Sequence, residues 1–260
     1  MKILVTGKKG FIATNIISHF SNSNFEIIGV GREDFDLTNK NSTDQWFKGK
    51  YFDLVIHTAN VGGSRLIDEN EIILNQNLSM FYNLTANKNK FFKLISFGSG
   101  AELGYPSTPY GISKYIINKI IDTEPNFYNI RVYGVFGANE LNTRFIKSNI
   151  IRYLNKEPLI IHQNKYMDFI FMDDLIKVVE HVINNPEEST SEAIYIEPYN
   201  LLDIAYMIND LSNHKSEIIV EQEGLGVPYV GSLYSFQYQL DYTGLKKGIE
   251  KVYKKLLNEY

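Results

Sequence analysis

The chain has 260 residues, of which 44% are hydrophobic and 22% are charged, proportions that are ordinary for a globular protein with one sizeable domain. Its formal net charge of −4 argues against nucleic acid as the main partner. There is no cysteine, which excludes disulfides, thiolate nucleophiles and cysteine metal sites. The first apolar run is too short for a signal peptide and no segment is long enough to span a bilayer, so we expect a cytoplasmic protein without a membrane partner.

Short apolar runs alternate with segments of helical period in the first half of the chain, which is the pattern of βαβ units. The expected strands cover residues 2–5, 25–30, 52–57, 92–96 and 128–133. The expected helices between them cover residues 11–20, 66–87 and 110–123. Strands with few polar interruptions are typical of a parallel sheet covered on both faces. The right-handed crossover rule then predicts the α/β class, with a doubly wound parallel Rossmann sheet.

The pattern is less regular after about residue 135, where we expect a smaller lobe. A helix is expected over residues 145–154 and a strand over residues 167–172, with Asp173 or Asp174 capping the helix that follows. The mixed tail comprises residues 201–211, 217–220 and 245–257. We therefore predict a dinucleotide-binding domain from residues 1–135 and 163–187, and a C-terminal substrate-binding lobe from residues 136–162 and 188–260.

Two glycines, Gly7 and Gly10, lie between the first expected strand and the first expected helix, in KILVTGKKGFIATN. Glycine permits a tight turn and lets backbone amides approach a pyrophosphate at the helix N-terminus. The third small position of this motif is Ala13, whose methyl group weakens the match. A strand-to-helix turn without a ligand is the alternative interpretation, but the βαβ context favours dinucleotide binding.

The end of the second strand indicates which dinucleotide binds. An NAD site places an acid there to bond the ribose 2′-hydroxyl, whereas an NADP site places a cation for the 2′-phosphate. Arg32 follows the strand here and Lys9 lies in the glycine turn, so we expect NADPH. A solvated surface charge is the alternative for Arg32, and Asp36 is expected either to bind adenine or to cap a turn.

Tyr110 and Lys114 lie four residues apart in YGISK, on one face of an expected helix. A lysine ammonium beside a phenol favours the phenolate, so such a tyrosine exchanges a proton with a developing alkoxide near neutral pH. Only this pair also follows a strand and a loop that carries a hydroxyl group, Ser99. Two further pairs have the same spacing and are explained by a shared helix surface: Tyr115/Lys119 and Tyr242/Lys246.

The chain resembles the extended short-chain dehydrogenase/reductases (the NAD-dependent epimerase/dehydratase family) over nearly its whole length, in TGKKGFIA, Ser99, YGISK and MDFIFMDDL. The resemblance implies that Tyr110 is the general acid/base, that Lys114 binds the nicotinamide ribose and polarises Tyr110, and that Ser99 holds the substrate oxygen. The implied cofactor contacts are Gly7, Lys9, Gly10, Phe11, Ile12, Arg32, Asp36, Leu37, Thr58, Ala59, Asn77 and Lys114. The implied substrate contacts are Ser99, Gly100, Ala101, Asn139 and Arg144.

Within that family, GREDFDLTNKNSTDQWFKGKYFDLVIHTANVGG is similar to nucleotide-sugar 4-ketoreductases of the GDP-fucose synthase and dTDP-4-dehydrorhamnose reductase type. The similarity implies NADPH reduction of the 4-keto group of a nucleoside-diphosphate 4-keto-6-deoxy hexose or heptose, in bacterial surface polysaccharide synthesis. GDP-fucose synthase also epimerises its substrate, with a cysteine two residues after the serine and a later histidine. Ala101 and the region of Arg144 occupy these positions, so we expect reduction without C3/C5 epimerisation. Glu102 is the alternative acid, unless its loop leaves it solvated.

Other interpretations stay open. Met167 stands where many relatives carry an arginine that contacts the substrate phosphate, so the nucleotide is not fixed. The chain is alternatively a nucleotide-sugar epimerase or dehydratase that retains NAD, or a non-catalytic NADP-binding sensor. The scattered histidines lack metal-ligand spacing, so we expect no metal, and His57 at a strand end is expected to be structural. The family resemblance also implies a homodimer formed through the helices over residues 66–87 and 110–123.

Overall fold

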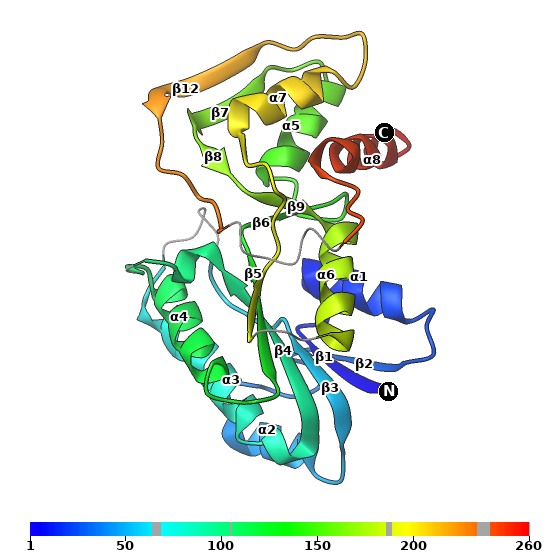
Figure 1. Ribbon diagram of the computed structural model, residues 1–260, viewed down its shortest axis with the longest axis vertical. Coiled ribbons are helices and arrows are strands. Elements are labelled where there is room, and N and C mark those ends of the chain that lie inside the picture. The colour runs from blue at the N-terminus through cyan, green and yellow to red at the C-terminus, as the bar shows by residue number, and fades with distance from the viewer. Residues whose placement is uncertain (64–68, 105, 186–188, 233–239, 260) are drawn as a thin grey trace. The chain divides into compact units, whose positions relative to one another are not determined.

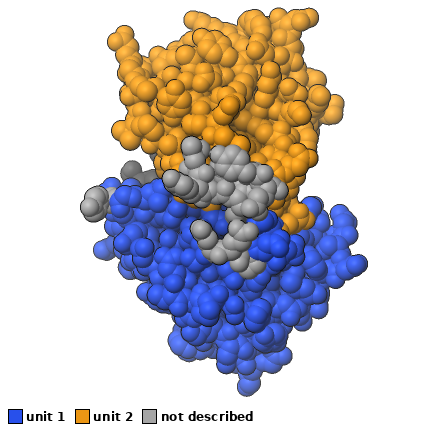
Figure 2. All heavy atoms as spheres, viewed as in Figure 1, with its two compact units in different colours: residues 1–131, 181–191 blue, residues 132–180, 192–260 orange. Residues whose placement is uncertain are grey.

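The computed structural model describes residues 1–63, 69–104, 106–185, 189–232 and 240–259. The chain divides into two compact units (Figure 2): unit 1 is Met1–Arg131 with His181–Ser191, and unit 2 is Val132–Glu180 with Glu192–Tyr260. This division reflects packing alone. The assignment of a cofactor-binding domain to residues 1–135 and 163–187, and of a substrate lobe to the rest, therefore stays a prediction.

Unit 1 is built on a six-stranded sheet in the order β10-β5-β4-β3-β1-β2 (Figure 1). Its strands are β1 (Lys2–Thr6), β2 (Glu26–Val30), β3 (Phe52–His57), β4 (Phe91–Ser99), β5 (Phe127–Val132) and β10 (Thr190–Glu192). β1 pairs in parallel with both β2 and β3, and β3 pairs in parallel with β4. The predicted doubly wound α/β fold is confirmed. The chain changes direction across the sheet between β1 and β3, which is where ligands bind in open α/β folds.

Helix α1 (Phe11–Phe20) covers one face of this sheet, and α2 (Lys40–Phe47), α3 (Glu71–Thr85) and α4 (Pro109–Ile121) cover the other (Figure 1). Two short 3₁₀ helices, η1 (Lys88–Lys90) and η2 (Gly100–Glu102), flank β4. Leucine, isoleucine and phenylalanine side chains of α2, α3, α4 and the sheet form one continuous buried core. The helix expected over residues 66–87 is shorter and begins after Asn70, whose side chain accepts the Ile72 N–H. Residues 66–68 lie outside the described part of the chain.

The described part of unit 2 contains three two-stranded sheets, β11-β8, β12-β7 and β6-β9. Its elements are β6 (Gly134–Phe136), α5 (Phe145–Leu154), β7 (Leu159–Asn164), β8 (Tyr166–Met167), β9 (Phe169–Phe171), most of α6 (Met172–Asn184), β11 (Tyr199–Asn200), α7 (Leu201–Asn209), β12 (Ile218–Leu225) and α8 (Leu245–Leu257). The strand expected over residues 167–172 is confirmed in part: it is divided into β8 and β9, and Met172 belongs to α6. α6 begins at Met172, so Asp173 and Asp174 lie in its first turn. Among the described residues, no helix has the length and apolar character needed to cross a bilayer.

Candidate active site

The turn after β1 depends on its two glycines. Gly7 has a φ of +71°, in the left-handed region, and a Cβ there would lie 2.9 Å from the backbone N and Cα of Ala59. The Gly10 N–H donates to the Gly7 carbonyl at 2.8 Å, and Gly10 is the N-cap of α1. No side chain caps α1 within the described chain, so its first backbone N–H groups remain available to an anion.

A cavity of about 380 Å³ lies at the carboxyl ends of β1, β2 and β3. Most of the predicted cofactor residues line it: Gly7, Lys9, Gly10, Arg32, Asp36, Leu37, Thr58 and Ala59. Phe11 and Ile12 follow in the first turn of α1, outside this lining. The Asp36 carboxylate accepts the Thr38 N–H at 2.9 Å and the Thr38 hydroxyl at 2.8 Å, so it caps a turn in the cavity wall.

The side of the cavity beside Arg32 carries charges of both signs. Lys9 Nζ lies 2.9 Å from the Glu33 carboxylate, and Lys8 Nζ lies 2.6 Å from Asp34 and 3.4 Å from Glu33. Backbone and Lys9 hydrogen bonds hold the pKa of Glu33 below its usual range. Sequence reasoning did not identify Glu33, although it lines the cavity. These ion pairs are exposed, so solvent screens them and their partners exchange readily.

Tyr110 and Lys114 lie on α4, whose N-cap is Thr108. Lys114 Nζ donates to the Phe97 carbonyl at 2.7 Å and lies 5.6 Å from the centroid of the Tyr110 ring. Burial lowers the pKa of Lys114 to about 8, while the nearby Glu102 carboxylate acts in the opposite direction. The ammonium is thus held beside the phenol, as the expected proton transfer requires.

Ser99 ends β4 and caps η2, so its conformation is fixed by a local turn. Its Oγ accepts the Ala101 N–H at 3.2 Å, and its own N–H donates to the Glu102 carboxylate at 3.1 Å. α4 packs directly on this turn, because a Cβ at Gly111 would lie 2.6 Å from the Ala101 carbonyl oxygen. The structure therefore brings Ser99, Gly100 and Ala101 next to the helix that carries Tyr110 and Lys114.

The loop after β3 connects the cavity to α4. Gly63 has a φ of +75°, and a Cβ there would lie 2.9 Å from Cζ of the Tyr110 ring. The Glu69 carboxylate accepts the Gly63 N–H at 3.0 Å and the Tyr110 N–H at 2.9 Å. Glu69 thus fixes the loop against the start of α4. The sequence gives no signal for this role, since Glu69 is one acid in a polar run.

Asn77 on α3 supports the same loop. Its amide donates to the Val61 carbonyl at 2.9 Å and to Ser113 Oγ at 3.1 Å, and it accepts the Val61 N–H at 2.8 Å. Its predicted cofactor contact would therefore be indirect, through the cavity wall. His57 is buried with Nδ1 2.9 Å from Thr6 Oγ1, and burial lowers its pKa to about 3. This environment suits a structural histidine.

The two remaining predicted substrate residues belong to unit 2. The Asn139 side chain accepts a hydrogen bond from Lys255 Nζ at 3.2 Å. Arg144 is the N-cap residue of α5, but its side chain makes no capping hydrogen bond. Between them Glu140 is buried, and burial raises its pKa to about 8. The contact of Asn139 and Arg144 with substrate stays a prediction.

Comparison with known proteins places these features in a family. The family model described as "NAD dependent epimerase/dehydratase family" matches residues 3–196. A GDP-L-colitose synthase from Yersinia pseudotuberculosis is 33% identical over 103 residues, which are 38% of this chain and 33% of the relative. The matched segment thus spans about a third of that relative's length.

Two solved structures have the same fold at low sequence identity. A GDP-mannoheptose C4 reductase from Campylobacter jejuni with NADP bound is 17% identical with a TM-score of 0.82, covering 98% of both chains. A dTDP-4-dehydrorhamnose reductase from Clostridium acetobutylicum is 21% identical with a TM-score of 0.80, covering 99% of this chain and 100% of the other. With the family model matching three quarters of its length, the chain belongs to the NAD-dependent epimerase/dehydratase family.

Proposed function

We propose that the chain is a cytoplasmic, NADPH-dependent reductase of the 4-keto group of a nucleoside-diphosphate 4-keto-6-deoxy sugar, in bacterial surface polysaccharide synthesis. The observation that carries the proposal is the packing of the Ser99 turn against the helix that bears Tyr110 and Lys114. The similar proteins support the substrate class, because their names describe enzymes of GDP- and dTDP-sugars.

The residues of unit 1 fit a dinucleotide phosphate. The glycine turn and the uncapped start of α1 suit the pyrophosphate. Arg32 and Lys9 line the cavity and suit the ribose 2′-phosphate, because charge-assisted hydrogen bonds to phosphate are strong. When bound, NADPH supplies the hydride, so the protein must supply a proton and hold the ketone in place.

The three catalytic candidates have distinct roles in this reaction. The Tyr110 phenol gives its proton to the sugar carbonyl oxygen as that oxygen becomes an alkoxide. The Ser99 hydroxyl donates a hydrogen bond to the same oxygen and orients it. The Lys114 ammonium stabilises the phenolate that remains on Tyr110. With a pKa of about 8, Lys114 is charged at neutral pH and loses its proton in mild alkali.

Two residues support reduction without C3/C5 epimerisation. The Ala101 methyl group has no proton to exchange with the sugar, and it lies in the η2 turn next to Ser99. Glu102, the alternative acid, is buried rather than solvated, and both carboxylate oxygens accept hydrogen bonds from protein donors. These features support the proposal that no proton is moved at C3 or C5.

The test is a panel of nucleoside-diphosphate 4-keto sugars incubated with NADPH in D₂O, with the products analysed by NMR. We expect one equivalent of NADPH to be oxidised for each equivalent of product, with no deuterium at C3 or C5. Deuterium at either carbon would contradict the absence of epimerisation. Turnover without net oxidation of NADPH would contradict the reductase itself.

One observation favours a second candidate, an epimerase that retains NAD. The Glu33 carboxylate folds back over Gly31, since a Cβ on Gly31 would lie 2.6 Å from Glu33 Oε2. An acid at the end of the second strand is the kind of group that bonds a ribose 2′-hydroxyl. This candidate predicts that NAD copurifies with the protein and that NADH binds more tightly than NADPH.

A further inference from the structure

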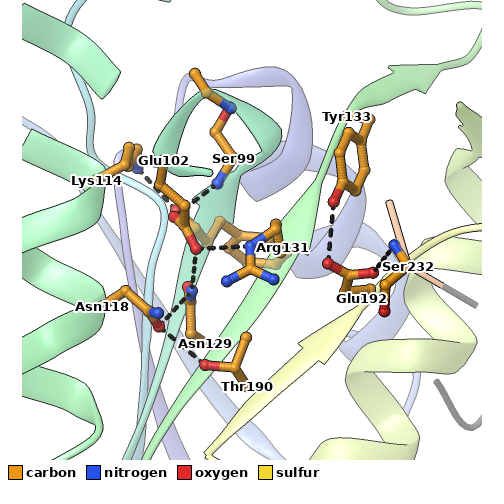
Figure 3. Close-up of polar contacts among 12 residues, drawn as sticks. Ser99, Glu102, Lys114, Asn118, Asn129, Arg131, Tyr133, Thr190, Glu192 and Ser232 are labelled. Atoms are coloured by element: carbon orange, nitrogen blue, oxygen red, sulfur yellow. Dashed lines mark hydrogen bonds and ion pairs between the residues drawn. The ribbon is translucent and has the colours of Figure 1, made fainter. Parts of the chain in front are cut away.

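A buried cluster of polar side chains lies next to Ser99 in unit 1, and we call it the Glu102 cluster (Figure 3): Glu102, Lys114, Asn129 and Arg131. Glu102 is 3% exposed. One of its carboxylate oxygens accepts hydrogen bonds from Arg131 Nε at 2.7 Å and from Asn129 Nδ2 at 3.2 Å. The other oxygen accepts the Ser99 N–H at 3.1 Å. Donors from β4 and β5 therefore fix this carboxylate.

Strand β4 leaves space for this cluster. A Cβ on Gly98 would lie 2.5 Å from Asn129 Nδ2 and 2.8 Å from Glu102 Oε2. Asn129 also donates to Asn118 Oδ1 on α4 at 2.9 Å, and Asn118 accepts the Thr190 hydroxyl at 2.9 Å (Figure 3). The cluster thus ties together α4, β4 and β5, the elements that carry or flank the catalytic candidates.

Stability alone does not account for such a cluster. A buried ion pair is often no more stabilising than apolar side chains of the same volume, because its desolvation cost offsets the attraction between the charges. The position of Glu102 suggests another role. It bonds the backbone of one catalytic candidate, Ser99, and the side chain of another, Lys114, points toward its carboxylate (Figure 3).

We propose that Glu102 is a positioning residue: it holds the backbone of Ser99 and is the counter-ion that keeps Lys114 charged. This proposal rests on the proposed function, because Ser99 and Lys114 are catalytic only within it. Glu102 acts through these two residues and does not touch the substrate.

The charges around Lys114 define what Glu102 contributes. The Tyr110 phenol faces Lys114 from its own helix, and His57 on β3 is neutral, since burial lowers its pKa to about 3. Arg131 on β5 contacts the far side of the Glu102 carboxylate. Burial lowers the pKa of Lys114 and Glu102 raises it. Glu102→Gln would therefore leave two buried cations without an anion, and Lys114 would lose its proton at lower pH.

A matched pair of variants separates this electrostatic role from a structural one. Glu102→Gln and Arg131→Gln both remove the same buried ion pair, but only the first removes the anion. We expect the Lys114 pKa to fall by about one unit or more in Glu102→Gln, because an opposite charge within a few ångströms shifts a pKa by that amount. In Arg131→Gln we expect it to equal or exceed the wild-type value, because the carboxylate remains.

The measurement is an NMR titration of ¹³C-labelled lysine side chains, with the Lys114 signal assigned by its loss in Lys114→Arg. It needs no substrate, so it decides the Glu102 proposal even if no ketone is reduced and the proposed function fails. An unchanged Lys114 pKa in Glu102→Gln, or an equal fall in both variants, would overturn the proposal. If Glu102→Gln does not fold, a lowered Lys114 pKa in Arg131→Gln would still overturn it.

Where a ketone is reduced, the pH profile gives a second readout. The alkaline limb of kcat should move to lower pH in Glu102→Gln and should not do so in Arg131→Gln. Glu124→Gln, which removes a carboxylate that pairs with Lys88 elsewhere in unit 1, is the control and should leave the profile unchanged. Equal loss of kcat in both cluster variants without movement of the alkaline limb would indicate a purely structural ion pair.

Discussion

Two of the clusters of acids and bases in the described part of unit 1 differ mainly in exposure. In the first, which we call the glycine-turn cluster (Lys8, Lys9, Glu33 and Asp34), the side chains of Lys9 and Glu33 are 79% and 42% exposed. In the Glu102 cluster, the paired side chains of Arg131 and Glu102 are 12% and 1% exposed. Exposed ion pairs contribute little and are screened by salt, whereas breaking a buried pair is costly. The same chemical groups thus form exchangeable ion pairs at the surface and fixed ion pairs in the core.

The largest effect should come from replacing Tyr110, whose neighbouring lysine, Lys114, is buried. Tyr110→Phe removes the proposed proton donor, so we expect kcat for ketone reduction to fall by about a thousandfold, within the usual range for general acid catalysis. Tyr115→Phe on the same helix is the matched control, because Lys119 Nζ lies 5.7 Å from its ring but is 58% exposed. Steady-state assays with NADPH should show full activity in the control. Equal activity in both variants would remove Tyr110 from the site.

The next effect concerns the cost of breaking the buried pair. Arg131→Met removes the cation that is hydrogen-bonded to Glu102 and leaves only Lys114 near this carboxylate, so the free energy of unfolding should fall by about 3 kcal/mol at pH 8. Burial raises the pKa of Glu102 and Arg131 opposes that rise, so the variant should hold the carboxyl protonated at higher pH. When the pKa of a group is higher in the folded than in the unfolded protein, the contribution of that group to stability is present at low pH. It is lost as pH rises through the folded pKa. The deficit should therefore shrink at pH 4.

Urea unfolding of both proteins at pH 4 and pH 8 measures this difference. Glu33→Gln is the control from the exposed cluster, and we expect its unfolding curve to match the wild type at both values. A deficit in Arg131→Met that does not change with pH would mean that the Glu102 charge is not its cause.

Binding of the NADPH 2′-phosphate should depend on Arg32, which lines the cavity beside the glycine-turn cluster. Arg32→Ala should weaken NADPH binding by about tenfold, because a charge-assisted hydrogen bond is worth about 1.5–3 kcal/mol, and should leave NADH binding unchanged. Lys88→Ala, which removes a cation paired with Glu124, is the control. Fluorescence titrations at low and high salt should show that the Arg32 effect shrinks with salt. Equal weakening of both cofactors would contradict a 2′-phosphate contact.

The smallest effect should come from replacing Glu33, the acid that competes with the cofactor phosphate for Lys9. Glu33→Gln frees Lys9 for the phosphate, so NADPH should bind about two- to threefold more tightly, in line with the small value of exposed ion pairs. The same titrations measure it. If the substitution instead weakens NADH binding and leaves NADPH unchanged, Glu33 bonds the ribose 2′-hydroxyl, and the epimerase that retains NAD becomes the better candidate.

Strong local patterns made much of the fold predictable. Helices α1 and α5 have the bounds expected from their apolar period, because each buries one continuous face. α2 was not predicted, since KNSTDQWF is mostly polar and buries only Thr43 and Phe47. Short strands such as β6 and β11 form from contacts between distant segments, and no local pattern encodes them.

The candidate site likewise has a part that local sequence patterns predict and a part that they do not. The glycine turn, Arg32, Ser99 and the Tyr110/Lys114 pair follow from short spacings in the sequence. Glu102 and Arg131 are far apart in the chain, and they pair because β5 lies next to β4 in the sheet. The sequence left open whether Glu102 is a substitute acid or a solvated loop residue. Only the fold brings Arg131 and Asn129 to it and leaves the space above Gly98.

The loop after β3 has a consequence for the order of events in turnover. One end of it, Thr58 to Val61, lines the cavity, and the other end places Gly63 against the Tyr110 ring. Asn77 and Glu69 fasten this loop to α3 and to the start of α4. A dinucleotide that fills the cavity would therefore steady the phenol before any sugar arrives. We expect ordered kinetics, in which the cofactor binds first and leaves last.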